Sequence, residues 1–220
     1  FKDWRANGWT NIEEAIAVSS DIYFYQIGGG FMDQKGLGIT NLEKYARMFG
    51  LGKSPENNFF SGSDGVIPSA EWKAKNFNGD PWRIGDTYHT AIGQYGFQVT
   101  PLQMLRAVGA VASRGRLVTP TIERVDRAGD RAGEQLPIED AYYDVVHEGM
   151  RMVVTEGTAG SLNFPQISVA AKTGTAQIKG NTRVNSWVIG FFPVEQPRYA
   201  FTVLMEDGPK DSNTDQSCHL

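Results

Sequence analysis

The tetrapeptide Lys172-Thr173-Gly174-Thr175 carries the strongest chemical signal in the sequence, because it interrupts the apolar run of residues 169–176. Glycine weakens a strand unless a ligand or another backbone must come close, and a lysine flanked by hydroxyls can bind an anion. The tetrapeptide therefore predicts one wall of an anion-binding cleft. An edge strand that a charged side chain protects from aggregation is an equally good interpretation of these four residues alone.

A second polar group, Ser19-Ser20-Asp21, separates two apolar runs that have a helical character. Hydroxyl and carboxylate oxygens at such a break commonly accept hydrogen bonds from the free N–H groups at the start of the next helix. Taken alone, the triplet favours this capping role over a chemical role.

Helices are expected to position the second group, and they occupy the first two thirds of the sequence. Capping boxes, in which the first and fourth side chains satisfy free N–H groups at a helix start, occur at residues 10–13, 40–43 and 100–103. Apolar runs predict two further helices, over residues 22–27 and from Tyr142 onward. The expected helix ends lie at residues 28–30, at Gly50 or Gly52, near Arg114 and near Gly157. Residues 53–99, rich in Gly, Pro, Asn and Asp, predict long ordered loops with short helical turns.

Strands are expected to position the tetrapeptide. Three segments rich in Val, Ile, Phe, Thr and Tyr follow one another at residues 168–177, 185–192 and 198–206, after a short strand expected at 117–125. They predict an antiparallel meander, since parallel strands would need a crossover helix between them. The fold class is therefore α+β, an antiparallel sheet flanked by helices, and residues 1–220 are expected to belong to one domain.

Composition excludes several classes of function. The 220 residues carry 21 Lys and Arg against 25 Asp and Glu, so the formal charge of -4 predicts no nucleic-acid partner. The single cysteine, Cys218, excludes an internal disulfide and a Cys-rich zinc site, and the three histidines are too far apart to suggest metal ligation. We therefore expect neither a metal nor a cofactor. No apolar stretch is long enough to predict a transmembrane helix or a signal peptide within the sequence.

Together, the Lys-Thr-Gly strand and the Ser-x-Asp triplet resemble two motifs of penicillin-binding proteins and class A β-lactamases, which also carry a Ser-x-x-Lys nucleophile motif. Longer segments are similar to class B penicillin-binding proteins of the elongation type, the penicillin-binding protein 2-like branch, where the third position of the triplet is also Asp. These segments are AIAVSSDIYFY (15–25), YARMFGLG (45–52), AIGQYGFQVTPLQML (91–105), Gly157-Thr158-Ala159 and residues 186–192. The resemblance implies the transpeptidase fold that this family shares with serine β-lactamases.

The sequence departs from the family pattern at two places. No Ser-x-x-Lys occurs in it, so the resemblance implies that the acylated serine and its lysine lie before Phe1. After Pro209 the sequence ends in SNTDQSCHL, where the family continues into a turn rich in Gly and Ala and a terminal helix. We expect the chain to be a partial transpeptidase domain, inactive alone, and to be truncated or divergent at its C-terminal end.

The implied activity is that of a DD-transpeptidase, which crosslinks peptidoglycan through a serine ester. The serine would attack the D-Ala-D-Ala carbonyl, expel the terminal D-Ala and pass the acyl group to an amine of a neighbouring stem peptide. The resemblance assigns Ser19 and Lys172 to the proton-handling network, with Asp21 orienting that network or facing the substrate peptide. A shared network requires Ser19 and Lys172 to lie within about one hydrogen bond or one water of each other.

The resemblance also assigns substrate-binding roles within the tetrapeptide. Thr173 and Thr175, with Lys172, would hold the terminal carboxylate of the substrate. The Thr175 N–H would serve as the second donor of the oxyanion hole, and Gly174 would keep the strand edge open.

The implied partners are peptidoglycan stem peptides, β-lactam antibiotics, a membrane glycosyltransferase and the rod-shape complex. The implied location is the bacterial cell envelope, in the periplasm or at the outer face of the cytoplasmic membrane, with an anchor outside this sequence. Three alternatives stay open: a β-lactamase, a penicillin-binding-like sensor, and a non-catalytic scaffold of the wall-synthesis complex.

Overall fold

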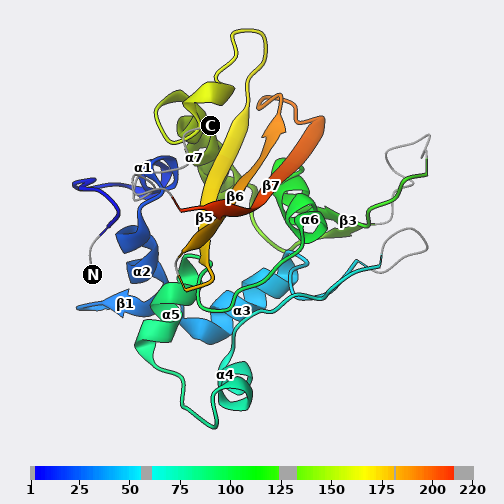
Figure 1. The fold of residues 1–220 in the computed structure, drawn as a ribbon. Coiled ribbons are helices and arrows are strands. Elements are labelled where there is room, and N and C mark those ends of the chain that lie inside the picture. Colours follow the sequence, from blue (N-terminus) through cyan, green and yellow to red (C-terminus); the bar gives the residue numbers. More distant parts are fainter. Residues whose placement is uncertain (1–2, 56–60, 124–132, 181, 211–220) are drawn as a thin grey trace.

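The computed structural model describes residues 3–55, 61–123, 133–180 and 182–210, and its architecture is α+β as expected (Figure 1). Cys218 and the divergent C-terminal segment lie outside the described residues, as does the end of the short strand expected at 117–125. The observed strand, β3 (Arg116–Val118), is shorter than expected, since residues 119–123 are described and form no strand, and it pairs with β4 (Gly133–Gln135).

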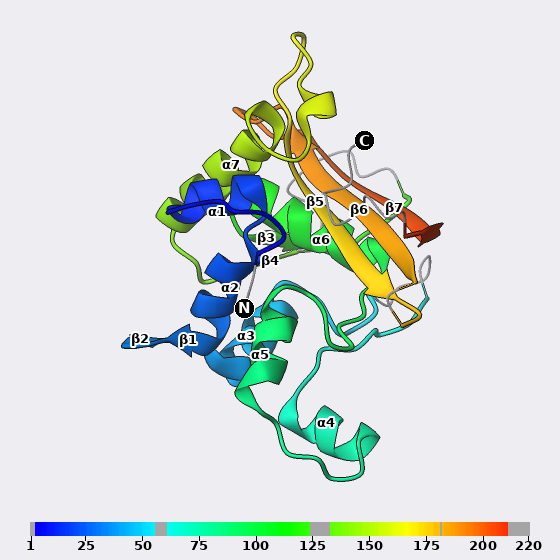
Figure 2. The same cartoon turned by 60° about the vertical axis from the view of Figure 1, so that its left-hand side comes forward.

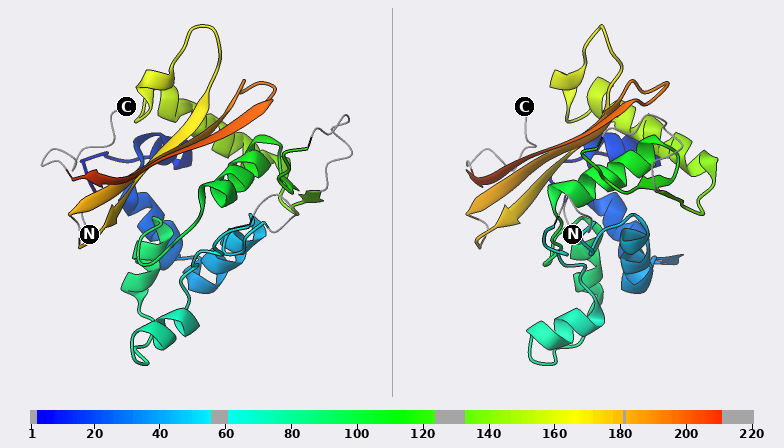
Figure 3. Two further views of the ribbon diagram at one scale, coloured as in Figure 1. Left: turned by 45° about the vertical axis from the view of Figure 1, so that its right-hand side comes forward. Right: turned by 90° about the vertical axis from the view of Figure 1, so that its right-hand side faces the viewer.

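The central sheet is the predicted meander. It contains β5 (Ala170–Ile178), β6 (Arg183–Phe192) and β7 (Tyr199–Pro209), all antiparallel and in the order β5-β6-β7. Helices α6 (Pro101–Ala112) and α7 (Asp140–Thr155) cover one face of the sheet (Figure 3). Their apolar side chains form the main core with the sheet, and the largest fully buried one is that of Phe191. Burial of this apolar surface holds the sheet in place, and with it the edge strand β5.

The N-terminal helices lie beside β5. Helix α1 (Ile12–Val18) packs on α7, and α2 (Asp21–Gly29) follows it after a two-residue turn (Figure 2). A lower layer contains α3 (Gly38–Met48), α4 (Ala70–Asn76) and α5 (Ile84–Ala91), with the small hairpin of β1 (Gly30–Phe31) and β2 (Gln34–Lys35) at its side. A short 3-10 helix, η2 (Gly160–Leu162), follows α7.

The three expected capping boxes had different outcomes. The box at residues 100–103 is confirmed, since Thr100 and Gln103 exchange hydrogen bonds at the start of α6. The first box lies one residue later than expected, at Asn11 and Glu14. The box at residues 40–43 is wrong, because α3 begins at Gly38 and the Glu43 carboxylate binds Arg47 instead of the helix start.

The expectation that glycines 28–30 end α2 is only partly correct. The helix continues through Gly29 and ends at Gly30, where φ is 87°. A Cβ at Gly28 would lie 2.4 Å from the Ala91 Cβ, and one at Gly29 would lie 2.1 Å from the Tyr88 ring. The first two glycines therefore allow α5 to approach α2 closely, and only the third stops the helix.

The remaining helix predictions are close to the structure. Gly50, with φ of 81°, follows the end of α3 as expected, and α6 and α7 end within two residues of their predicted ends. The loops expected over residues 53–99 contain helices of seven and eight residues, α4 and α5, which are longer than the predicted turns.

Candidate active site

The turn between α1 and α2 separates the roles of two neighbouring serines. Ser19 ends α1 in the left-handed conformation, with φ of 56° and ψ of 49°. Ser20 is buried and begins α2, where its hydroxyl accepts a hydrogen bond from the Tyr23 N–H at 3.3 Å. Capping by the triplet is therefore confirmed for Ser20. The Ser19 side chain is directed toward β5 instead.

Lys172 lies in the edge strand β5 and reaches Ser19 from a position 153 residues further along the chain. Its Nζ donates hydrogen bonds to Ser19 Oγ at 2.7 Å and to the Thr173 carbonyl at 2.9 Å. The predicted proximity of Ser19 and Lys172 is confirmed. Burial lowers the pKa of Lys172 to about 8, although the nearby Asp21 carboxylate acts in the opposite direction.

Asp21 is the first residue of α2 and lies close enough to Lys172 for their charges to interact. Burial raises the pKa of Asp21, the Asp3 carboxylate raises it further, and Lys172 opposes both effects. The shifts of Asp21 and Lys172 bring each group closer to neutral pH. Two groups shifted in this way, one of them hydrogen-bonded to the Ser19 hydroxyl, can accept and return protons.

The rest of the tetrapeptide has two different environments. The Thr173 side chain is buried, and its hydroxyl lies 2.6 Å from the hydroxyl of Thr158. Gly174 and Thr175 line the same cleft as Ser19. A Cβ at Gly174 would meet only the Trp187 Cβ at 3.6 Å, which is an ordinary contact. The protein's own packing therefore does not require glycine at this position.

The two motifs line one cleft, with a volume of about 810 Å³. Its walls combine hydroxyl, carboxylate and ammonium groups with aromatic rings, which suits a peptide that ends in a charged group. Part of the wall comes from side chains outside these two motifs: Trp4, Tyr25, His89, Gln94, Tyr95 and Gln177.

The loop that carries Tyr95 at the cleft wall is held in place by an ion-pair network around the buried Lys73. Lys73 is 3% exposed, and its Nζ lies 2.9 Å from Asp80 and 2.7 Å from Asp86. The Tyr95 ring packs edge-on against Trp72 of the same region. These contacts join α4 to α5 and hold the loop that carries Tyr95 at the cleft.

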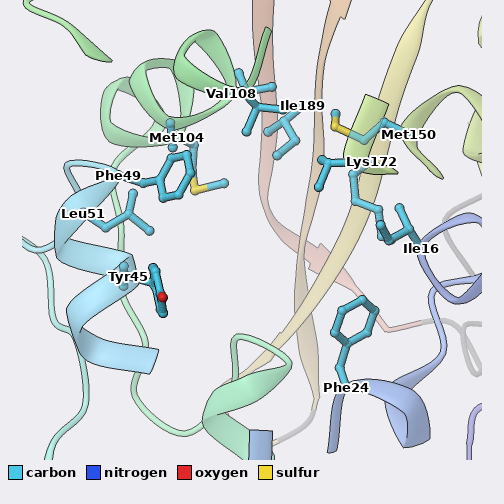
Figure 4. Close-up of a pocket in the computed structure, with 14 residues that line it drawn as sticks. Ile16, Phe24, Tyr45, Phe49, Leu51, Met104, Val108, Met150, Lys172 and Ile189 are labelled. Atoms are coloured by element: carbon cyan, nitrogen blue, oxygen red, sulfur yellow. The ribbon is translucent and has the colours of Figure 1, made fainter. Parts of the chain in front are cut away.

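A second space, which we term the apolar hollow, adjoins Lys172 and has a volume of about 450 Å³ (Figure 4). Tyr45 and Ala46 of helix α3 line this space, and no residue of α3 is buried. The labelled side chains around the hollow are those of Ile16, Phe24, Tyr45, Phe49, Leu51, Met104, Val108, Met150, Lys172 and Ile189. Lys172 therefore lies between a polar cleft and an almost wholly apolar space.

Three residues of the site were not predicted from the sequence. Asp3 and Trp4 bind the turn at Ser19, and Thr158 pairs with Thr173. Residues 3 and 4 precede the first periodic segment, so no pattern indicates their position. Thr158 lies in a segment that carries the family resemblance, which is the one signal that could have identified it.

Within the described ranges, no cluster of three or more His, Cys, Asp or Glu side chains is arranged to hold a metal ion. None of the helices in the same part of the chain has both the length and the apolar character needed to cross a bilayer. The residues that line the cleft supply hydroxyl, ammonium, carboxylate, imidazole, amide and backbone groups.

Comparison with known sequences gives one consistent family. Residues 1–218 match the penicillin binding protein transpeptidase domain. The chain is 30% identical to the peptidoglycan D,D-transpeptidase MrdA of Acinetobacter baumannii, over 94% of this chain and 34% of that protein. It is 28% identical to MrdA of Escherichia coli K12, over 94% of this chain and 36% of that protein. The chain thus spans about a third of the length of these relatives.

Solved structures give the same result. The Pseudomonas aeruginosa PBP2 in complex with WCK 5153 is 31% identical, with a TM-score of 0.80 over 97% of this chain and 47% of that chain. The PBP2 of Helicobacter pylori in its complex with MreC is 34% identical, with a TM-score of 0.79 over 95% of this chain and 39% of that chain. The α+β fold with its three-stranded meander is therefore the fold of these proteins.

Proposed function

Since the chain belongs to the penicillin-binding protein transpeptidase family, we propose that it supplies most of the active site of a peptidoglycan D,D-transpeptidase. The observation that carries the proposal is the 2.7 Å hydrogen bond from Lys172 Nζ to Ser19 Oγ at the cleft. Two motifs 153 residues apart meet there, as a shared proton network requires.

The reaction is acyl transfer in two steps. A serine Oγ attacks the carbonyl carbon of the penultimate D-Ala, and the bond to the terminal D-Ala nitrogen breaks as that nitrogen takes up a proton. An amine of a neighbouring stem peptide then attacks the serine ester, loses a proton and releases the serine. Ser19 relays the proton to the departing nitrogen, and Asp21 orients the network or faces the incoming peptide.

The charge state of Lys172 supports this role. Its pKa of about 8 means that the neutral form of the amine is accessible near physiological pH, whereas an ordinary lysine would stay protonated. The neutral amine accepts the proton of the attacking serine through Ser19, and the protonated amine returns it through Ser19 to the departing nitrogen within the same step. A lysine that served only to protect a strand edge from aggregation would act through an exposed charge, so burial would bring no advantage.

The tetrapeptide is the part of the cleft that binds the substrate. Lys172 and the hydroxyls of Thr173 and Thr175 hold the terminal carboxylate, and the Thr175 N–H donates to the oxyanion that forms in each step. The Thr158 hydroxyl, which also lies at the cleft, orients that of Thr173. Gly174 leaves the strand edge open to the peptide, which agrees with the absence of any packing reason for glycine there.

The nucleophile itself does not occur in these 220 residues, because no Ser-x-x-Lys motif is present. We propose that it lies on a segment outside them, and that an apolar face of this segment fills the apolar hollow beside Lys172. A segment in that position would bring its serine next to Ser19 and Lys172. Burial of its apolar side chains would supply the driving force for packing.

The partners proposed for the whole protein follow from its relatives. The H. pylori PBP2 was solved in a complex with MreC, and another relative belongs to a peptidoglycan synthase complex that coordinates polymerization and crosslinking. We propose that the protein acts at the bacterial cell envelope with a glycosyltransferase and the rod-shape complex. Stem peptides are its substrates, and β-lactams, which mimic them, acylate the same serine.

The experiment measures the rate at which a fluorescent penicillin acylates the longer protein chain that includes a Ser-x-x-Lys motif. Changing Lys172→Ala should lower the acylation rate by about 10²-fold or more, as expected for loss of a general base. Lys35→Ala, an exposed lysine of β2, is the matched control and should label normally. Equal labelling of Lys172→Ala would overturn the proposal. Rapid hydrolysis of the penicilloyl ester would indicate a β-lactamase instead.

A further inference from the structure

We propose that Asp3 and Trp4 form a clamp that holds the Ser19–Asp21 turn in its working conformation, and that Asp3 is a positioning residue for Ser19. The inference deepens the proposed function and rests on it for the reaction that Ser19 serves. The clamp itself is a set of hydrogen bonds in the structure.

The turn needs an external restraint because of its backbone. Ser19 has φ of 56° and ψ of 49°, the left-handed region that L-residues other than Gly, Asn and Asp seldom adopt. Such a conformation costs about 1 kcal/mol or more and persists when surrounding contacts determine it. The last turn of α1 supplies some of these contacts, since the Ser20 N–H donates to the Ala15 carbonyl.

Asp3 and Trp4 supply the rest from outside the helices. The Asp3 carboxylate accepts hydrogen bonds from Ser20 Oγ at 2.6 Å and from the Asp21 N–H at 3.1 Å. The Trp4 indole Nε1 donates to the Ser19 carbonyl at 3.0 Å. All three residues of the turn are therefore held by two consecutive side chains.

The Asp3 carboxylate is itself fixed. Its Oδ2 also accepts a hydrogen bond from Asn7 Nδ2 at 3.0 Å, and its Oδ1 accepts one from the Trp4 N–H at 2.9 Å. The negative charge lies at the N-terminal end of α2, a helix of nine residues, where the helix dipole stabilises an anion. The clamp is thus a rigid anchor for the turn.

The clamp also determines that Ser19, and not Ser20, contacts Lys172. The Ser20 hydroxyl has one proton, which it donates to Asp3, while it accepts a hydrogen bond from the Tyr23 N–H. Its hydrogen-bonding capacity is directed away from β5. Ser19 is then the serine of the turn that presents its hydroxyl to Lys172.

Asp3 further affects the charge of Asp21. Its carboxylate is one of the causes that raise the pKa of Asp21, after burial and against the effect of Lys172. Replacing Asp3 by asparagine removes this charge and keeps the oxygen that accepts from the Asp21 and Trp4 N–H groups, but its amide nitrogen cannot accept from Ser20 Oγ or Asn7 Nδ2. The variant therefore removes the electrostatic effect and retains only part of the clamp.

The functional test measures penicillin acylation by the chain that includes a Ser-x-x-Lys motif, as a function of pH and drug concentration. Asp3→Ala should lower the rate constant of acylation by about 10- to 100-fold, with the initial binding constant nearly unchanged, as expected for a misplaced relay. Asp3→Asn should keep more of the rate and shift the acidic limb of the pH profile to lower pH, because the pKa of Asp21 falls. Trp4→Phe should lower the rate without moving this limb.

Matched controls come from the same part of the chain. Trp9→Phe changes a fully exposed indole of the N-terminal segment, and Asp33→Asn changes an exposed carboxylate of the β1–β2 turn. Both should leave the acylation rate and the pH profile unchanged. An active wild-type protein whose rate and profile are unaffected by Asp3→Ala and Trp4→Phe would overturn the positioning role.

A second measurement tests the clamp independently of the reaction. Hydrogen exchange of the same chain, with its Ser-x-x-Lys motif, should show faster exchange of the Asp21 amide in Asp3→Ala than in wild type, because that amide donates to Asp3. Unchanged exchange would overturn the clamp itself. Loss of acylation in the wild-type protein, with the exchange difference present, would instead contradict the proposed function.

Discussion

The ammonium group of Lys172 and the hydroxyl of Ser19 lie 2.7 Å apart, between a polar cleft and an apolar hollow. The contact joins the edge of the sheet to the turn between two helices. Lys172 is therefore partly removed from water while it keeps a hydroxyl and a carbonyl as partners. The pKa of its ammonium group therefore depends both on the polar groups of the cleft and on the apolar side chains of the hollow.

Stability should depend on pH through Lys172. The pKa of this lysine is about 8 in the folded chain and near 10.5 when it is exposed, so the unfolded state binds more protons between these values. The cost of burying the group is present in full below pH 8 and diminishes as the pH rises across this window. The free energy of unfolding should therefore gain from Lys172 as the solution becomes alkaline.

Urea unfolding of wild type and Lys172→Met at about pH 7 and about pH 9.5 checks this. The methionine variant removes the titrating group, so its stability relative to wild type should be greater at the lower pH. A difference between the two proteins that does not change with pH would contradict the lowered pKa.

The 220-residue chain should form no covalent adduct with benzylpenicillin. A serine reacts only when an adjacent base activates it, and the Ser-x-x-Lys pair is missing from this sequence. Mass spectrometry after incubation should detect the unmodified mass alone. A stoichiometric penicilloyl group on Ser19 would show that this serine is a nucleophile and contradict its assignment as a relay.

Gly157→Ala should destabilise the protein. A Cβ at Gly157 would lie 2.2 Å from the Ala17 carbonyl oxygen and 2.8 Å from the Val153 Cα, so α1 would have to move away from the end of α7. We expect a loss of about 1–3 kcal/mol in the free energy of unfolding. Gly160→Ala is the control, since a Cβ there meets no atom within 4 Å. Similar stabilities of the two variants would contradict the close approach.

Thr158→Val should destabilise the protein, because it removes one hydroxyl of the buried Thr158–Thr173 pair. The valine has a similar shape, but the Thr173 hydroxyl would lose the partner that now lies at 2.6 Å. An unpaired buried hydroxyl costs about 1–3 kcal/mol, and thermal unfolding measures the loss. Thr158→Ser keeps the hydroxyl and should retain most of the stability. A valine variant as stable as wild type would contradict a contribution of the hydroxyl pair to stability.

The parts of the fold that were predictable are those in which one local pattern has one physical meaning. Segments rich in β-branched and aromatic residues that follow one another after short connections can pair in few ways, so the meander of β5, β6 and β7 followed from the sequence. The box at Thr100 and Gln103 was equally clear, because proline follows the cap directly. The contact of Ser19 with Lys172 came from the family resemblance, since no local pattern links residues so far apart.

The parts that were missed are those in which one pattern serves two purposes. Glycines 28 and 29 look like a helix stop but provide space for α5, and only the position of that helix distinguishes the two roles. Glu43 has the spacing of a capping residue, yet Arg47 one turn later binds it more favourably. Asp3 acts through tertiary contacts with a distant turn, which local propensity does not encode.

The packing of α1 on α7 has a consequence for how the chain folds during synthesis. The Ser19 turn leaves the ribosome more than 100 residues before α7, on which α1 packs, and before β5, whose Lys172 binds Ser19. The apolar face of α1 therefore stays unburied until α7 emerges. Closing such a long loop makes folding slow and exposes the nascent chain to chaperones and proteases. Assembly of the candidate site should thus be one of the final events in folding.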